Sequence, residues 1–223
     1  GMLTGFELIA RLGMEFAVRY VEGARDPLAQ RHDWYVLAEI ASSRSDEDAN
    51  ATMEHLLADA MEAGEAEDAV IAQSGAQANA FWHLRENLSW AQKPEGGSIK
   101  HDISVPVAAI PAFINAANAA VEALIPGVRF CTFGHMGDGN LHYNISQPVG
   151  ADKVVFLHRW DEVNVAVHDI VSNFDGSISA EHGIGQLKRG ELQRFKDPVA
   201  LDLMRRIKAT FDPAGIMNPG KVL

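Results

Sequence analysis

The chain has 223 residues, of which 47% are hydrophobic, and its formal net charge is −11 at pH 7. This size and composition are typical of one large globular domain or two small ones, which excludes a mainly disordered chain. The acidic excess argues against nucleic acid or an anionic membrane surface as a partner, because both require clustered Lys and Arg side chains.

The single cysteine, Cys131, excludes an internal disulfide framework and is typical of a reducing compartment. No uninterrupted apolar run is long enough for a membrane span, and the N-terminus shows no signal pattern. The sequence therefore predicts a cytoplasmic protein with no membrane span. Gly1 before Met2 is typical of a residue left by tag cleavage, so we expect the natural chain to begin upstream.

The first predicted element is a helix over Leu3–Tyr20, where apolar residues recur every three or four positions. Ser45, with Asp48 three residues later, resembles a capping box and predicts the start of a second helix. We interpret the acidic residues of that helix as a solvated face. The other elements expected before residue 125 are strands at 34–40, 69–72 and 99–105 and helices at 77–90 and 111–124.

Two strands, at 128–135 and 140–146, flank a Gly-Asp-Gly turn and predict a hairpin. The elements expected after the hairpin are a helix at 152–173, a short strand at 177–180 and a last helix at 199–211. This alternation predicts an α+β fold, with an antiparallel or mixed sheet, helices on one face and a resemblance to repeated ferredoxin-like units.

His135 and His142 lie on the two strands of the hairpin. If Asp138-Gly139 forms a two-residue type I′ turn, the histidines are directly opposite each other, with Cβ atoms about 4.5 to 5.5 Å apart. Two imidazoles at this separation can bind one cation, or they can merely stack on a sheet surface. Asn144 shares the face of His142, and because Asn and His are poor strand formers we favour a binding site.

Glu181 and His182 form a second candidate site within the glycine-rich segment Gly176–Gly185. Adjacent residues of an extended backbone point to opposite sides, so one could bind a metal while the other acts as a base. On its own this segment is equally consistent with a simple turn.

Arg85, Ser89 and Lys100 form a third candidate site. Arg85 and Ser89 are four residues apart and share a face of the predicted helix, and Lys100 lies on the next strand. A guanidinium and an ammonium group suit a small molecule that carries carboxylates. The alternative is that Arg85 pairs at the surface with Glu86 or another acid.

A family resemblance rests on three segments, which are GHMGDGNLHYN at Gly134–Asn144, SISAEHGIG at Ser177–Gly185 and DPAGIMNPGKVL at Asp212–Leu223. They resemble the C-terminal domain of FAD-linked oxidases of the vanillyl-alcohol-oxidase type, in particular D-2-hydroxyglutarate dehydrogenase, D-lactate dehydrogenase and the glycolate oxidase large subunit. The resemblance implies that residues 1–223 form a substrate- and metal-binding domain, with a helical segment at about 186–223. It also implies that FAD is held mainly by an FAD-binding domain of the same protein, which is absent from this chain.

The same resemblance implies roles for individual residues. His182 is implied to be catalytic, as the acceptor of the substrate hydroxyl proton, and Ser89 replaces a threonine of the family. The implied ligands of a divalent metal, expected to be zinc, are His135, His142 and Glu181, and the implied substrate-binding residues are Arg85, Ser89, Lys100 and Asn144.

The expected function is therefore oxidation of a small D-2-hydroxyacid to a 2-oxoacid. The metal would lower the pKa of the hydroxyl, His182 would take its proton, and hydride would pass to the flavin of the absent domain. Without that domain the chain is expected to be redox-inactive, and its uncovered face could mediate self-association into a homo-oligomer. The alternatives are a metal-dependent hydrolase that uses the same His/His/Glu site and a metal-binding structural module.

Overall fold

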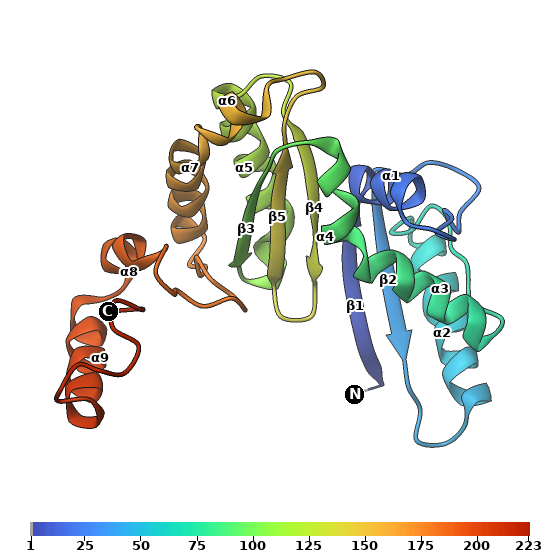
Figure 1. The fold of residues 1–223 in the computed structure, drawn as a ribbon. Helices are drawn as coiled ribbons and strands as arrows, with labels where there is room; N and C mark the ends of the chain where they lie inside the picture. The colour runs from blue at the N-terminus through green and yellow to red at the C-terminus, as the bar shows by residue number, and fades with distance from the viewer. Residues whose placement is uncertain (1) are drawn as a thin grey trace.

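The structure, a computed structural model, describes residues 2–223. Gly1, on which the expected tag remnant rests, lies outside the described residues. At the centre is an antiparallel sheet with the strand order β2-β1-β4-β5-β3 (Figure 1). The strands are β1 (Leu3–Ala10), β2 (Trp34–Ile40), β3 (Ser98–Ser104), β4 (Arg129–His135) and β5 (Asn140–Ser146).

Helices cover this sheet and extend beyond it (Figure 1). They are α1 (Arg11–Tyr20), α2 (Asp46–Glu62), α3 (Gly75–Glu86), α4 (Leu88–Ala91), α5 (Ile110–Leu124), α6 (Lys153–Leu157), α7 (Trp160–Asn173), α8 (Arg189–Phe195) and α9 (Pro198–Phe211). Two short 3₁₀ turns, Lys93–Glu95 and Val107–Ala109, precede β3 and α5. The predicted α+β class and the antiparallel sheet are confirmed.

One face of β3 and β5 packs against α5 and α7. The alternate β5 residues Leu141, Tyr143 and Ile145 are fully buried there, in one core with Phe113 of α5 and Val167 of α7. Because side chains alternate along a strand, this burial turns the polar residues of β5 to the opposite face. The core thus fixes which face of the sheet carries the candidate site.

The segment from β3 to α7 forms a ferredoxin-like unit. Its order is β3-α5-β4-β5-α7, and a bridge between Ser104 and Ser177 adds the start of a fourth strand beside β3. This is the split βαβ arrangement in which helices cover one face of the sheet. Strands β1 and β2 extend the same sheet beyond β4.

The sequence predicted helices on one face of the sheet, and in the structure further helices also pack on the second face. Met14 and Phe16 of α1 and Leu88 of α4 form a second core with Ile9 of β1 and Phe133 of β4. Cys131 is buried beside this core, and burial raises the pKa of its thiol to about 12, so it stays protonated. These helices cover only the β1 and β4 side of the second face, and the candidate site lies next to them.

The predicted helix over Leu3–Tyr20 is wrong in its first half, which forms β1. The spacing of Phe6, Ile9 and Leu12 fits a helix, but Glu7–Ala10 are all buried between β2 and β4. A run that is buried on both faces has no strand periodicity, so the spacing could not identify it. Thr4 and Gly5 also have low helix propensity.

Three other expected elements change. The stretch 69–72 is irregular, because it has no neighbouring strand, and the strand at 177–180 shrinks to the single bridge at Ser177. The helix at 77–90 breaks at Asn87, whose side-chain amide donates to the backbone carbonyl of His83 at 2.7 Å and so competes with the helix. The helix at 152–173 divides into α6 and α7, and α8 is an addition.

The segment Val107–Leu124, which contains α5, is long and apolar enough to cross a membrane by length and composition alone, with a mean hydropathy of 1.5 over 18 residues. The core helix of a globular domain meets the same criteria. In this structure Phe113, Ala117 and Val121 of α5 are fully buried against the sheet.

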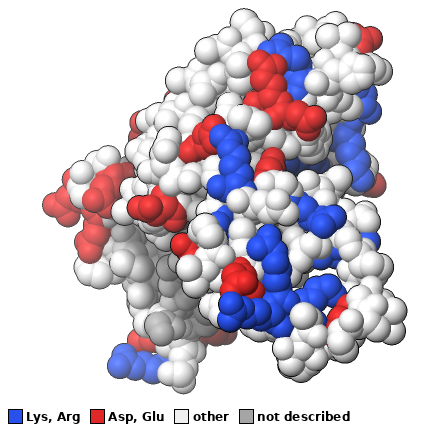
Figure 2. Space-filling view, turned by 90° about the vertical axis from the view of Figure 1, so that its left-hand side faces the viewer, with Lys and Arg blue, Asp and Glu red and all other residues white. Residues whose placement is uncertain are grey.

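Beyond α7 the chain continues through α8 and α9, which lie below α7 and apart from the sheet in the view of Figure 1. Figure 2, which views this side, shows Lys and Arg side chains interspersed with Asp and Glu. Two of the ion pairs here are Arg194 with Asp169 at 2.6 Å and Arg206 with Asp202 at 2.7 Å. Charges of both signs therefore lie close together on this face.

Candidate metal and substrate site

His135 of β4 and His142 of β5 lie on the same face of the sheet, and their ring centroids are 6.2 Å apart. The prediction that they are directly opposite each other is wrong, because His135 pairs with Asn140 and His142 pairs with Phe133. A register shift of two residues keeps both side chains on one face, since side chains alternate with a period of two. The histidines are therefore diagonal neighbours.

The register differs because the turn is longer than expected. Residues 136–139 all lie in the turn, and the backbone N–H of Gly139 donates to the carbonyl of His135 at 3.1 Å. The Asp138 carboxylate accepts the backbone N–H of Asn140 at 2.9 Å, which closes the loop before β5 begins.

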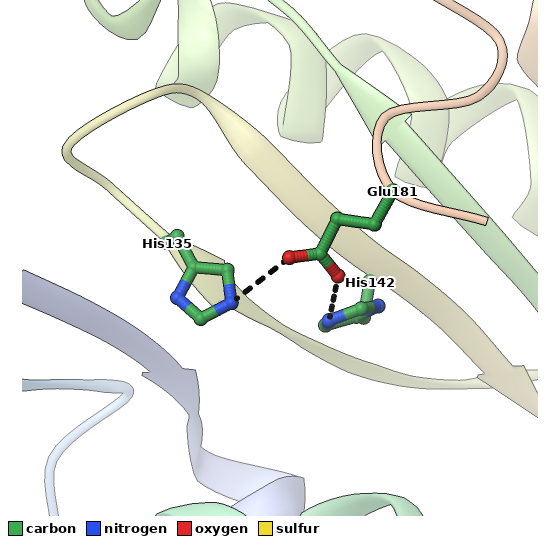
Figure 3. Close-up of side chains that lie close together, drawn as sticks. All are labelled: His135, His142 and Glu181. Carbon is green, nitrogen blue, oxygen red and sulfur yellow. Dashed lines mark ion pairs between the residues drawn. The ribbon is translucent and has the colours of Figure 1, made fainter. Parts of the chain in front are cut away.

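Glu181 approaches the two histidines from the loop that follows α7, and its carboxylate lies between the imidazoles (Figure 3). One oxygen is 3.5 Å from His135 Nε2 and the other is 3.8 Å from His142 Nε2. The three groups offer ligand atoms that all lie within 4.8 Å of one another. Segments distant in sequence thus converge on one point.

These donors fit a divalent metal such as zinc. Zinc bonds of about 2.1 Å in tetrahedral geometry put neighbouring ligand atoms about 3.4 Å apart, which is close to the 3.5 Å between His135 Nε2 and Glu181 Oε1. Burial lowers the pKa of His142, and the charge of Arg85 adds to that effect. A lowered pKa favours the neutral imidazole, which is the form that binds a metal. Three protein ligands leave one position open.

Asp102 of β3 anchors the loop that carries Glu181 and His182. It lies opposite His142 in the sheet and is 3% exposed. Its Oδ2 accepts the backbone N–H of Glu181 at 2.9 Å and that of His182 at 2.8 Å. Burial opposes ionisation of Asp102, but these two hydrogen bonds, together with the neighbouring His182 and His142, lower the pKa of the carboxyl.

His182 lies beside the three donors but remains accessible. Its ring centroid is 6.1 Å from that of His142, and its Nδ1 is 3.8 Å from Asp102 Oδ2. The side chain is 68% exposed, so a ligand that occupied the open metal position could reach it.

The expected substrate-binding residues fall into two groups. Lys100 and Asn144 are opposite each other on β3 and β5, and Lys100 Nζ is 3.4 Å from the carbonyl of Ser89. Ser89 and Lys100 are exposed, whereas Asn144 is 2% exposed. Because the helix breaks after Glu86, Ser89 lies on α4 and not on the helix of Arg85.

Arg85 belongs to the second group and is buried, with 8% exposure. It pairs with neither Glu86 nor another surface acid. Its Nε donates to Glu7 Oε2 at 2.8 Å, and its Nη2 lies 2.6 Å from the same oxygen. Arg85 also lies over the ring of Phe133, 5.0 Å from the centroid.

The sequence analysis missed two polar residues of this site, Glu7 and Asp102, with exposures of 5% and 3%. Asn140, which alternation along the strand places on the same face as His142 and Asn144, is 2% exposed. One oxygen of Asp102 and both side-chain polar atoms of Asn140 are buried without a hydrogen-bond partner in the described structure, which is unusual outside functional sites. The available signal was an acidic residue inside an otherwise strand-like apolar segment, in FELIA and in KHDIS.

Comparison with known proteins relates the chain to a family of FAD-linked oxidases. Residues 2–222 match the family of FAD linked oxidases, C-terminal domain. The chain is 38% identical to D-2-hydroxyglutarate dehydrogenase of Stutzerimonas stutzeri, over 99% of this chain and 47% of that protein. It is 36% identical to the mitochondrial D-2-hydroxyglutarate dehydrogenase of Arabidopsis thaliana, over 100% of this chain and 38% of that protein.

A third relative is the D-2-hydroxyglutarate–pyruvate transhydrogenase of Saccharomyces cerevisiae, which is 31% identical over 100% of this chain and 45% of that protein. The chain thus spans less than half the length of these three relatives. Because some relatives are mitochondrial and others bacterial, the cytoplasmic location stays a prediction. The match over residues 2–222 shows that the chain belongs to the C-terminal domain family of the FAD-linked oxidases.

Proposed function

We propose that this chain is the substrate- and metal-binding domain of an FAD-dependent dehydrogenase that oxidises a D-2-hydroxyacid to a 2-oxoacid. The observation that carries the proposal is the convergence of His135, His142 and Glu181, with His182 beside them. Two imidazoles and a carboxylate suit a divalent metal, and the adjacent imidazole suits proton transfer.

His135, His142 and Glu181 would hold the metal, zinc in our proposal. A metal bound there supplies Lewis acidity toward the 2-hydroxyl and 1-carboxylate oxygens of the substrate. The three residues themselves contribute a fixed position, because two are strand residues and the third is held through Asp102.

His182 accepts the hydroxyl proton. The imidazole of His182 is exposed, so it can accept a proton from a bound substrate. The hydrogen bond from the backbone N–H of His182 to Asp102 holds the backbone at this position in place. Arg85 supplies positive charge near His142, Lys100 supplies a second positive charge on the neighbouring strand β3, and Asn144 and Ser89 lie next to Lys100. Two cationic groups favour a substrate with two carboxylates, and the names of the relatives make D-2-hydroxyglutarate the substrate to test first.

The hydride acceptor is outside this chain in the proposal. FAD, held mainly by a further domain of the same protein, supplies that acceptor, in keeping with relatives that are about twice the length of this chain. The 223-residue chain by itself is then redox-inactive. The same family match gives no support to the metal-dependent hydrolase that the sequence left open.

The experiment has two parts. Calorimetric titration of the chain with Zn²⁺ should give one site per chain, which is lost in His135→Ala and in Glu181→Gln. The intact FAD-containing protein should reduce its flavin when D-2-hydroxyglutarate or another D-2-hydroxyacid is added. Stoichiometric zinc binding that survives both substitutions, or a flavin that no D-2-hydroxyacid reduces, would refute the proposal.

A further inference from the structure

Glu7 of β1 is buried between two groups of the proposed site. It is paired with His135 across the β1–β4 register, and its side chain is 6% exposed. Its Oε1 lies 2.7 Å from His135 Nδ1, while Oε2 accepts from Arg85 Nε at 2.8 Å. One carboxylate thus uses its two oxygens for two different elements, β4 and α3.

The contact with Glu7 determines which nitrogen of His135 carries the proton. A carboxylate oxygen can only accept a hydrogen bond, so the neutral imidazole must carry its hydrogen on Nδ1. The lone pair is then on Nε2, which is the nitrogen that faces Glu181 at 3.5 Å. A metal-ligating histidine commonly donates its other N–H to a carboxylate in this way.

The same Glu7 carboxylate also holds the guanidinium of Arg85 in one orientation. The guanidinium is held between Glu7 and the ring of Phe133, and Phe133 lies opposite His142, with 4.9 Å between the ring centroids. A buried arginine needs a partner for its charge, because an unpaired buried cation is strongly unfavourable. Nε and Nη2 face Glu7, which leaves both N–H groups of Nη1 and the second N–H of Nη2 to donate to a substrate carboxylate.

We propose that Glu7 is a positioning residue that sets the Nδ1–H tautomer of His135 and the orientation of Arg85 through one shared carboxylate. The proposal rests on the proposed function, because it takes His135 as a metal ligand and Arg85 as a substrate-binding residue. It couples the two: a change at Glu7 acts on the metal site through His135 and on the substrate site through Arg85.

Glu7→Gln tests the proposal, because the amide has nearly the same shape but only one accepting oxygen. The charge of Arg85 draws that oxygen toward α3, so the amide NH₂ faces His135 and favours the Nε2–H tautomer, which cannot bind a metal through Nε2. We expect the affinity of the 223-residue chain for Zn²⁺ alone to fall about 10- to 100-fold, the range for loss of such a partner.

A second readout needs neither a metal nor catalysis. The ¹⁵N chemical shifts of the His135 ring distinguish the two neutral tautomers in the metal-free chain, above the pH range in which imidazoles titrate. The wild-type chain should show Nδ1–H and the Glu7→Gln variant Nε2–H. The wild-type measurement decides the proposal even if the variant does not fold.

Glu95→Gln is the matched control. Glu95 is a carboxylate that is 11% exposed and, like Glu7, bridges two basic side chains: it is 2.7 Å from Arg19 Nη1 and is paired with Arg129. It contacts none of the proposed ligands. This variant should lose stability as Glu7→Gln does while it keeps the wild-type zinc affinity and the Nδ1–H tautomer of His135.

A double variant separates positioning from general damage. In Glu7→Gln/Arg85→Gln the amide oxygen at position 7 no longer has to face a guanidinium. It can therefore accept the Nδ1–H of His135, and we expect the zinc affinity to regain most of what Glu7→Gln alone loses. A structural defect would instead worsen with the second substitution.

Failure of this proposal can be distinguished from failure of the proposed function. An Nε2–H tautomer in the wild-type chain, or full zinc affinity in Glu7→Gln, overturns the role of Glu7 while leaving the metal site intact. Absence of any zinc binding that depends on His135 would count against the metal site itself, and the tautomer measurement would still decide whether Glu7 positions His135.

Discussion

The Oδ2 atom of Asp102 accepts the backbone N–H of His182 at 2.8 Å, and the same oxygen accepts the N–H of Glu181 at 2.9 Å. Within residues 2–223 the backbone of this loop is also tied to β3 by the bridge between Ser104 and Ser177 and by the bond from the Ala180 N–H to the Asp102 carbonyl at 3.3 Å. The Asp102 carboxylate holds the next two residues, which are a proposed ligand and the proposed base.

Asp102→Asn should loosen this loop without unfolding the sheet. The two hydrogen bonds then have a neutral acceptor, and such bonds contribute about 0.5 to 1.5 kcal/mol each where bonds to a charged group contribute about 1.5 to 3 kcal/mol. We expect faster hydrogen exchange at the amides of Glu181 and His182 and a zinc affinity about 10-fold lower, as for other residues that orient a ligand.

The control for this substitution is Asp152→Asn. Asp152 also accepts two backbone N–H groups, from Val154 and Val155 at the start of α6, at 2.8 and 2.9 Å. The Asp152→Asn variant should change amide hydrogen exchange only within α6. Equal zinc affinity in the Asp102 variant and wild type would show that the loop does not need this anchor.

His182→Ala should separate proton transfer from metal binding. Loss of a general base lowers the rate of the chemical step by about 10²- to 10⁴-fold. We therefore expect the rate of flavin reduction in the intact protein to fall by that factor, with wild-type zinc affinity. His55→Ala, at an exposed position of α2, is the control and should retain full activity. Wild-type flavin reduction in the His182 variant would remove this residue from the mechanism.

The candidate site was largely predictable because its main residues follow local rules. Alternation along β5 places His142 and Asn144 on one face whatever the turn, and a register error of two residues left His135 on that face. Glu181 and His182 came from a motif that carries them together.

The supporting residues could not be predicted in the same way, because their roles depend on which strands become neighbours. Glu7 faces His135 only because β1 pairs with β4, and Asp102 reaches the loop only because the segment after α7 returns beside β3 at Ser177. These pairings join residues that are distant in sequence, and hydrophobic periodicity does not encode them. The incorrect helix at Leu3–Ala10 has the same origin.

A buried histidine pair behind the site predicts loss of stability in acid. His101 and His168 have ring centroids 5.5 Å apart and are 2% and 1% exposed. Burial and the neighbouring His168 lower the pKa of His101 to about 3, and burial and Lys188 lower that of His168 to about 4.

The direction in which stability changes with pH follows from proton binding to the folded and the unfolded chain. Below about pH 6.5 the unfolded chain protonates both histidines while the folded chain does not, so the free energy of unfolding falls with decreasing pH, by about 1.4 kcal/mol per pH unit for each histidine. The fall stops as the pH drops through the folded pKa values. Urea unfolding of the metal-free chain at several pH values between about pH 7 and pH 5 should show this decrease in the free energy of unfolding.

His168→Gln should reduce this pH dependence, because an amide does not titrate. The expected difference from wild type in the change of unfolding free energy between about pH 6.5 and pH 5 is about 2 kcal/mol. His55→Gln, exposed on α2, should leave the wild-type slope. An unchanged slope in His168→Gln would mean that this residue is protonated in the folded protein.

The turn between the two histidines gives the last prediction, because two of its glycines differ in what an added Cβ would meet. Gly139 has a φ of +81°, and a Cβ there would lie 2.0 Å from the carbonyl oxygen of Val105. Gly137 has no heavy atom within 4 Å of the same position.

Gly139→Ala should therefore lower the unfolding free energy by about 1 to 3 kcal/mol from backbone strain alone, with the clash in addition, whereas Gly137→Ala should stay within about 0.5 kcal/mol of wild type. Since the turn sets the diagonal relation of His135 and His142, Gly139→Ala should also weaken zinc binding, and Gly137→Ala should not. Urea unfolding and zinc titration of the two variants check this, and equal behaviour would mean that the turn can shift without disturbing the histidines.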